Sequence, residues 1–256
     1  MDTTTAQTNP GQLRIVAPVL DEALALPGLL AELRELGLLE QTIFVDNGST
    51  DGSREIIEHT GGLLLREPRR GYGYPCLRGA AAAVDAGAHA VVFMEADGTD
   101  DPAQARMLAD PVLRDRADLV IGSRRAAVRG NQGRMPLHQR LGNDCLALAL
   151  WAFFGLRLSD DGPFRAVSGA LLGRLALGER AYAFPTEMAV QAKLLKARVL
   201  AIDTHYRLRV GRSKIAGTWR GSLLAVRDIT WCLLRLRLFG FDTADAPSQH
   251  VRGWLS

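Results

Sequence analysis

The stretch AVVFMEADGTDDP, residues 90–102, joins a short apolar run to an acidic turn. The run is rich in valine and is bounded by glycine and proline, so it is predicted to be a buried strand. Glu95 and Asp97 follow at its carboxyl end, where open α/β sheets bind their ligands. Two carboxylates in this spacing suit a hard cation such as Mg²⁺ or Mn²⁺. The alternative is an acidic turn in which Asp101 caps a helix that starts after Pro102.

The composition fits one sizeable α/β domain. The chain has 256 residues, of which 47% are hydrophobic, and its formal net charge is +3. That charge is too small to indicate nucleic-acid binding. Cys76, Cys145 and Cys232 are too far apart in the sequence to suggest a metal site or a disulfide framework, which favours a reducing compartment. We therefore expect a cytoplasmic protein with no nucleic-acid partner.

One domain is expected over residues 13–241, between two disordered tails at 1–12 and 242–256. The first tail is polar and lacks the basic and apolar regions of a signal peptide. No uninterrupted apolar run in the sequence reaches the roughly 18–20 residues that a membrane span needs. Any contact with a membrane is therefore expected to be peripheral, at its inner face.

Short apolar runs alternate with helical patterns throughout the first half of the chain. This alternation is typical of an α/β fold with a mostly parallel sheet flanked by helices. Polar residues follow the carboxyl ends of successive runs, which a shared binding edge explains better than separate turns do. The predicted strands are Leu13–Val19, Thr42–Val45, one within Gly61–Arg66, Ala90–Met94 and Asp118–Gly122.

The second half contains two helical patterns with apolar surfaces. Leu141–Leu158 suits either a core helix or a helix that packs on a membrane surface. Residues 217–241 form an amphipathic pattern with arginine and tryptophan, which suits an anionic membrane or a solvated basic face. Between them, the sequence predicts a polar turn over Ser159–Arg165, a helix from Pro185 and a strand over Val199–Val210.

Several short motifs follow one another in a recognisable order. They are APVLDE at 17–22, VDNGSTDG at 45–52, GYG at 71–73, EADG at 95–98, IGSR at 121–124, DDGPFR at 160–165, TEM at 186–188 and GRSK at 211–214. Together they resemble the inverting family 2 glycosyltransferases, most closely the dolichyl- and polyprenyl-phosphate sugar synthases. The resemblance covers about Leu13 to Phe241 and implies the GT-A fold, a Rossmann-like α/β architecture, here with C-terminal amphipathic helices.

The resemblance implies a nucleotide-sugar donor, a polyprenyl phosphate acceptor and a Mg²⁺ or Mn²⁺ cofactor. It places Asp97 and Glu95 at the metal, and it implies catalytic roles for Asp97, Asp160 and Arg165. The implied acceptor-phosphate residues are Arg124, Arg165, Arg212, Ser213 and Lys214. The implied donor-binding residues are Pro18, Val19, Leu20, Glu22, Asp46, Asn47, Gly48, Ser49, Gly71, Gly73, Ala96 and Asp97.

Two positions depart from the family pattern. Asp21 stands where the first loop usually has Asn, and Glu95 stands where the metal motif has its first Asp. Glutamate keeps the charge but is one methylene longer, so direct coordination can give way to a contact through water. Asp97 is therefore the expected principal ligand, and Glu95 is expected to assist it.

The implied reaction does not need a strong general base. A phosphate monoester is mostly dianionic at neutral pH, because its second pKa is about 6. None of the 5 histidines lies in a motif, which agrees with this chemistry. Cationic side chains that stabilise phosphate are required instead. Charge reversal at Arg165 or Lys214 is expected to abolish transfer while the fold survives.

Three other functions fit parts of the sequence. The first is a family 2 glycosyltransferase with a soluble acceptor, such as a small phosphorylated metabolite. The second is a nucleotidyltransferase, which would need a glycine-rich basic loop that Ala17–Glu22 does not provide. The third is a non-catalytic nucleotide-sugar-binding protein, which the replacement at Glu95 motivates. The sequence identifies neither the sugar nor the base.

Overall fold

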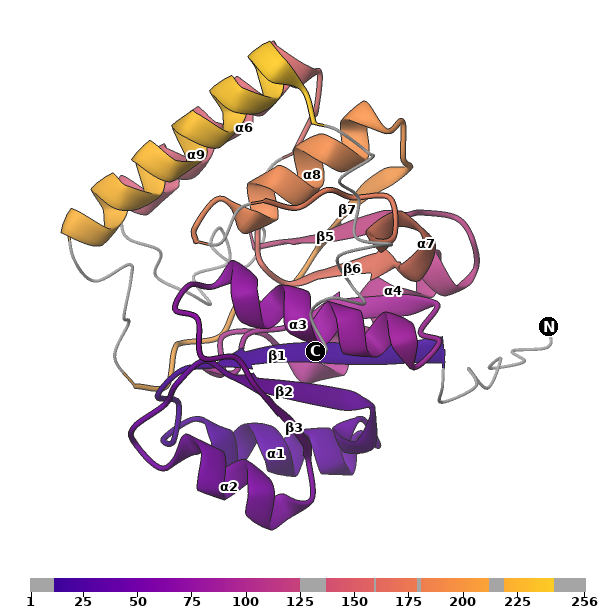
Figure 1. The fold of residues 1–256 in the computed structure, drawn as a ribbon, viewed down its shortest axis with the longest axis vertical. Coiled ribbons are helices and arrows are strands. Elements are labelled where there is room, and N and C mark those ends of the chain that lie inside the picture. The colour runs from indigo at the N-terminus through magenta and orange to yellow at the C-terminus, as the bar shows by residue number, and fades with distance from the viewer. Residues whose placement is uncertain (1–11, 125–136, 159, 179–180, 212–218, 242–256) are drawn as a thin grey trace.

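A computed structural model describes residues 12–124, 137–158, 160–178, 181–211 and 219–241 (Figure 1). Within these residues, 7 strands form one sheet in the order β3-β2-β1-β4-β6-β5-β7. The sheet therefore takes strands from both halves of the sequence. The strands are β1 (Leu13–Val19), β2 (Thr42–Asp46), β3 (Leu63–Arg66), β4 (Ala90–Phe93), β5 (Leu119–Ser123), β6 (Arg165–Ser168) and β7 (Val199–Asp203).

The predicted mostly parallel α/β sheet is confirmed, with one addition. In the described sheet, β6 alone runs antiparallel, between β4 and β5. Its central Ala166 lies opposite Val92 on one side and Val120 on the other. The sequence predicted a polar turn ending at Arg165 and no strand after it. The strand, RAVS, mixes polar and apolar residues directly after a polar turn, so no apolar run marks it in the sequence, and its two neighbours provide its pairing.

Alternate side chains of the strands enter two separate cores. On β1, Ile15 and Ala17 pack into one core and Val16 into the other, as the two-residue period of a strand requires. The first core lies under α1 (Leu26–Glu35), α2 (Ser53–Thr60) and α4 (Ala105–Leu113), and short 3₁₀ turns occupy Leu39–Gln41 and Pro102–Gln104. The second lies under α3 (Gly73–Asp85), α7 (Gly169–Leu172) and α8 (Phe184–Leu194).

Two long helices lie outside this layered arrangement. α6 (Leu137–Phe154) and α9 (Trp219–Phe239) both contact α8 and extend from the end of the molecule opposite α1 and α2 (Figure 1). Leu150 and Leu236 are buried against the second core. No helix among the described residues is sufficiently long and apolar to cross a membrane. Large apolar side chains are nevertheless exposed on both helices: Leu148, Trp151, Phe153, Leu224, Val226, Trp231, Leu234, Leu238 and Phe239.

The last predicted strand is shorter than expected. β7 ends at Asp203, and the following residues turn toward the loop after β4 instead of continuing the sheet. An isolated bridge pairs Tyr206 with Asp100 in that loop. The predicted tails fall outside the described residues, except for Gln12. The segment from Thr204 to Val210 therefore lies against the loop after β4, which the alternation of its sequence did not reveal.

Candidate active site

The carboxyl ends of β1, β2 and β4 meet at one edge of the sheet. Val19 at the end of β1 lies opposite Asp46 at the end of β2. Met94, just after β4, donates its backbone N–H to the carbonyl of Val16, 3.0 Å away. The fold thus brings together three loops that are distant in sequence. They contain the predicted donor-site residues Pro18, Val19, Leu20, Glu22, Asp46, Asn47, Gly48, Ser49, Ala96 and Asp97.

Hydroxyl groups connect the loop after β1 to the loop after β2. The backbone N–H of Asp21 donates to Ser49 Oγ at 2.9 Å, and that of Glu22 donates to Ser53 Oγ at 2.7 Å. The backbone N–H of Ser49 in turn donates to Asp46 Oδ1 at 3.0 Å. Two of the predicted ligands, Asp46 and Ser49, therefore also fix the shape of the loops that present them.

Asn47 is buried and organises the glycine loop. Its Nδ2 donates to the carbonyls of Glu67 and Arg69 at 2.8 and 2.7 Å, and its Oδ1 accepts from the N–H of Gly71 at 3.3 Å. These bonds use both ends of the amide for contacts within the protein. The sequence predicted Asn47 as a donor-binding residue, and the structure gives its side chain a positioning role between two loops.

Glycines permit a close approach of chain segments at this edge. Gly48 has φ +87°, a left-handed conformation that favours glycine, and the Arg70 guanidinium carbon lies 3.7 Å from where a Cβ would be. Gly71 also has a positive φ, of +135°. Gly73 is the first residue of α3 and is buried. The predicted residues Gly71 and Gly73 thus connect the site to the N-terminus of α3, which favours anions.

The metal motif after β4 holds a buried carboxylate with three polar neighbours. Asp97 is 2% exposed. Its Oδ1 accepts from the backbone N–H and the hydroxyl of Thr99 at 2.9 and 2.6 Å. Its Oδ2 lies 2.9 Å from Nη1 of Arg209, which comes from the segment after β7. Glu95 precedes it, and the backbone N–H of Glu95 donates to Asp100 Oδ2 at 2.8 Å.

The carboxyl groups of this loop disfavour one another's ionised form. Burial raises the pKa of Glu95, and the charges of Asp97 and Asp100 raise it further. Burial also raises the pKa of Asp100, to about 7. A divalent cation would relieve this repulsion, and carboxylate oxygens are the ligands that Mg²⁺ and Mn²⁺ accept. The donor set therefore fits the predicted cation at Asp97 and Glu95.

Protein ligands alone do not complete such a site. Among the described residues, no three Asp, Glu, His or Cys side chains converge in a group that could hold a metal ion. Mg²⁺ typically binds one or two carboxylates and completes its shell with water and substrate phosphates. Two carboxylates therefore fit the share of ligands that the protein would supply to such a cation.

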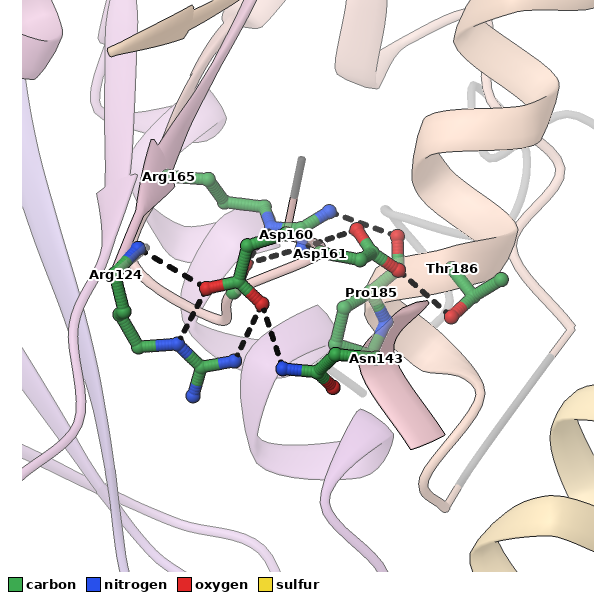
Figure 2. Close-up of polar contacts among 8 residues, drawn as sticks. Arg124, Asn143, Asp160, Asp161, Arg165, Pro185 and Thr186 are labelled. Atoms are coloured by element: carbon green, nitrogen blue, oxygen red, sulfur yellow. Dashed lines mark hydrogen bonds and ion pairs between the residues drawn. The ribbon is translucent and has the colours of Figure 1, made fainter. Parts of the chain in front are cut away.

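A second polar cluster forms where β5 meets the chain before β6. Arg124 binds Asp160 through both ends of its guanidinium, with Nε–Oδ2 at 2.7 Å and Nη2–Oδ1 at 2.8 Å. Asn143 of α6 donates its Nδ2 to the same carboxylate at 3.1 Å (Figure 2). Burial raises the pKa of Asp160, but the hydrogen bonds and charge of Arg124 outweigh it, so the pKa lies below its ordinary value. Asp160 thus fixes the direction of Arg124.

Arg165 has a structural environment rather than an open one. Its side chain is 1% exposed, and Nη2 lies 2.9 Å from Asp161 Oδ1. Nη1 donates to the Pro185 carbonyl at 2.7 Å, and Nε donates to that of Gly162 at 3.1 Å. Asp161 also accepts from the Thr186 hydroxyl at 2.7 Å (Figure 2). These contacts tie the chain before β6 to the start of α8 and engage the Arg165 guanidinium with groups of the protein itself.

Some predicted site residues lie outside the described residues, and the sequence analysis did not select others that the structure places at the candidate site. Arg212, Ser213 and Lys214 fall in residues 212–218, which are not described. Arg209 was not selected, although it contacts both Asp97 and Glu22. The only feature of the sequence that pointed to Arg209 was its alternation with Arg207 just before the GRSK motif. Asn143 was not selected either, although it donates to Asp160.

Comparison with known proteins agrees with this geometry. Residues 14–175 match the family model described as glycosyl transferase family 2. A glycosyltransferase of Mycobacterium tuberculosis is 33% identical over 215 residues, covering 84% of this chain and 94% of the relative. An undecaprenyl-phosphate mannosyltransferase of Micrococcus luteus is 28% identical over 241 residues, covering 87% of this chain and 97% of the relative.

Solved structures with a similar fold are more distant in sequence. Glucosyl-3-phosphoglycerate synthase of Mycobacterium tuberculosis, in its complex with UDP, has a TM-score of 0.67 and 20% identity. The match covers 87% of this chain and 79% of that one. This likeness confirms the GT-A-like fold. Because the family model spans more than half of the sequence, this chain belongs to glycosyl transferase family 2.

Proposed function

We propose that this chain transfers a hexose from a nucleotide sugar to the phosphate of a polyprenyl phosphate, with inversion and with Mg²⁺ or Mn²⁺ as cofactor. The main supporting observation is that the Glu95–Asp97 motif lies at the same sheet edge as the loops after β1 and β2. Asp46 and Ser49 would contact the nucleoside of the donor. The Mycobacterium tuberculosis synthase of similar fold was solved with Mn²⁺ and UDP-glucose.

Asp97 and Glu95 would hold the cation, which supplies neutralising charge to the leaving nucleoside diphosphate. Arg124 is oriented by Asp160 and would face the acceptor phosphate, where a bidentate guanidinium is well suited to phosphate oxygens. The acceptor phosphate needs no strong base, since it is mostly dianionic at neutral pH. Arg212, Ser213 and Lys214 are proposed to contact it on the resemblance of their motif alone.

Two observations favour a lipid acceptor. The Micrococcus luteus relative, which this chain matches over 97% of that relative's length, is named as an undecaprenyl-phosphate mannosyltransferase. The exposed apolar side chains of α6 and α9 could also enter the headgroup region of a bilayer, with Arg227 and Arg237 attracting anionic lipids. The competing function is transfer to a soluble phosphorylated acceptor. The Mycobacterium tuberculosis synthase was solved with phosphoglyceric acid, but at 18% identity that likeness concerns only the fold.

The test is a transfer assay with two acceptors. Labelled GDP-mannose, UDP-glucose and UDP-N-acetylglucosamine are each incubated with the protein and Mn²⁺, with undecaprenyl phosphate in detergent or with 3-phosphoglycerate. Chelator-sensitive label in the lipid extract is the expected result. Label on phosphoglycerate alone would identify the soluble-acceptor enzyme, and donor binding without transfer to either acceptor would indicate a non-catalytic nucleotide-sugar-binding protein.

A matched pair of carboxylate variants locates the activity. Asp97→Asn removes the charge of the proposed cation ligand, and transfer is expected to fall by about 100-fold or more. Asp85→Asn makes the same change at an exposed position at the end of α3 and should leave transfer unchanged. Equal activity in the two variants would contradict the assignment of Asp97.

A further inference from the structure

The segment Thr204–Val210, which we name the strap, lies across the loop that carries the metal motif. The backbone N–H of Arg207 donates to the carbonyl of Thr99 at 2.9 Å, and that of Val210 donates to the carbonyl of Asp97 at 3.1 Å. These main-chain bonds fix the strap against the loop on either side of residue 209. Any side chain at that position is therefore held close to the carboxylates of the site.

Arg209 of the strap bridges two acidic loops. Its Nη1 lies 2.9 Å from Asp97 Oδ2, and its Nη2 lies 2.8 Å from Glu22 Oε1. Glu22 and Asp97 are 8% and 2% exposed, so each needs a compensating charge. The buried Nε of Arg209 has no hydrogen-bond partner among the described residues. The guanidinium therefore neutralises the carboxylates without using all of its own donors.

Arg209 and a divalent cation would compete for Asp97. One oxygen of this carboxylate already accepts two bonds from Thr99, and the other contacts Arg209. A Mg²⁺ ion binds carboxylate oxygen at about 2.0–2.1 Å and would repel a guanidinium held at the same oxygen. Metal binding at Asp97 therefore requires the Arg209 contact to loosen. The guanidinium nitrogen released from Asp97 would then be available to a further anion.

We propose that Arg209 is an exchangeable counter-cation, which neutralises Asp97 when the site holds no donor and moves to the donor diphosphate when the metal arrives. The inference rests on the metal-dependent donor site proposed above. Guanidinium binds diphosphate oxygens through charge-assisted hydrogen bonds, so the exchange replaces one anionic partner with another. Metal alone must displace Arg209 without this compensation and binds weakly. Metal and nucleoside diphosphate together bind cooperatively.

The test measures Mn²⁺ binding by electron paramagnetic resonance, with and without UDP or GDP, in wild type and Arg209→Gln. The variant should bind Mn²⁺ alone about tenfold more tightly, because the competing charge is absent. Its cooperativity between Mn²⁺ and nucleotide should fall by about tenfold, a change within the usual range of coupling between sites. Arg209→Lys retains the positive charge but not the planar guanidinium. Its Mn²⁺ affinity and its cooperativity with nucleotide should lie between those of wild type and Arg209→Gln.

Two further variants serve as controls. Arg207→Gln changes the neighbouring arginine of the strap, which pairs with Glu32 and Asp101 rather than with the metal motif, and should leave Mn²⁺ binding unchanged. Asp97→Asn should abolish the Mn²⁺ binding that nucleotide strengthens. This result would place the ion at Asp97. Thermal unfolding of each variant shows whether it is folded. If Arg209→Gln does not fold, Arg209→Lys takes its place in the comparison.

The outcomes separate this inference from the proposed function. Unchanged or weaker Mn²⁺ binding in folded Arg209→Gln, beside normal cooperative binding in wild type, would overturn the exchange and leave the donor site intact. It would show that Arg209 only positions Asp97. Absence of nucleotide-dependent Mn²⁺ binding in wild type would instead overturn the metal-dependent donor site, and the exchange with it.

Discussion

Charged side chains in the interior are the main feature at the scale of single residues. Arg124, Arg165 and Arg209 each contact a buried carboxylate. Removing one partner of a buried pair leaves the other charge uncompensated, which is more costly than losing a surface ion pair. Substitutions here therefore test both folding and function.

The environment of Arg165 changes the result expected for its variants. The sequence predicted that charge reversal would abolish transfer with the fold intact. Because the guanidinium is buried against Asp161 and two carbonyls, Arg165→Met is expected to lower the free energy of unfolding by about 3–5 kcal/mol. Urea unfolding followed by circular dichroism measures this loss. Arg116→Met, at an exposed position, is the control and should change stability by less than about 0.5 kcal/mol.

A double variant distinguishes the ion pair from the packing of the side chain. Adding Asp161→Asn to Arg165→Met removes the uncompensated carboxylate, so part of the lost stability should return. A purely additive double variant would show that the carbonyl contacts, rather than the charge pair, account for the loss.

Asp100 gives the stability of the protein a defined pH dependence. Its pKa is raised from 3.8 to about 7 in the folded state, chiefly by burial. The folded protein therefore holds this proton more tightly than the unfolded chain does. The stability that protonated Asp100 contributes is fully present below the pKa of the unfolded chain. It is lost as the pH rises through the folded pKa of about 7.

The matching experiment compares wild type with Asp100→Asn in chelator. An asparagine does not titrate and can still accept the backbone N–H of Glu95. Between pH 5 and 8, wild type should lose stability relative to the variant, by at most about 1.4 kcal/mol per pH unit. Urea midpoints at each pH measure the difference. Parallel profiles for the two proteins would contradict the raised pKa.

At the scale of elements, the close packing of α3 on the sheet depends on one glycine. A Cβ at Gly79 would lie 2.3 Å from Val16 Cγ1 and 3.1 Å from Val45 Cγ2. Alanine there improves helix propensity by up to about 1 kcal/mol but forces β1 and β2 away from the helix. At Gly79, α3 therefore packs directly against β1 and β2, the two strands that precede donor loops.

Gly79→Ala and Gly28→Ala form a matched pair of helix variants. Gly79→Ala should destabilise the protein by about 1–3 kcal/mol through overpacking. Gly28→Ala in α1, where no atom beyond its chain neighbours and the backbone of its own helix lies within 4 Å of the added Cβ, should stabilise it by up to about 1 kcal/mol. Thermal unfolding measures both changes. A similar shift in the two variants would show that the contact with Val16 relaxes at little cost.

At the scale of the whole molecule, α6 and α9 carry many of the exposed large apolar side chains. The three donor loops lie at one edge of the sheet, whereas α6 and α9 extend from one end of the molecule with exposed apolar side chains (Figure 1). Trp231 is 63% exposed and Leu238 is 70% exposed. Such side chains favour the boundary between headgroups and acyl chains when basic residues accompany them. An apolar surface beside basic residues suits the membrane contact that the proposed lipid acceptor would require.

Flotation with liposomes tests this surface. Wild type should float with anionic vesicles at low salt, and the double variant Trp231→Ser/Leu238→Ser should bind at least about tenfold more weakly, because it loses two membrane-inserting side chains. Leu63→Ser changes an exposed leucine on β3 and should float like wild type. Equal flotation of all three proteins would exclude the helical surface as the membrane contact.

Much of the site could be predicted because its residues occur in contiguous motifs at strand ends. Asp46, Ser49 and Asp97 were placed at one sheet edge by their position after apolar runs, and the structure brings their loops together. Arg209 could not be found in this way. Its position depends on the strap leaving β7 and crossing the loop after β4, which joins residues more than a hundred positions apart.

The sequence by itself determined the alternation of strands and helices, the mostly parallel sheet and the edge where the donor loops meet, because side-chain periodicity and turn residues are local properties. The tertiary structure decided the insertion of β6, the burial of Arg165 and the pairing of Arg209 with Asp97. These features depend on contacts between distant segments. An arginine in a motif looks the same in sequence whether it faces a substrate or a buried carboxylate, and only packing fixes its partner.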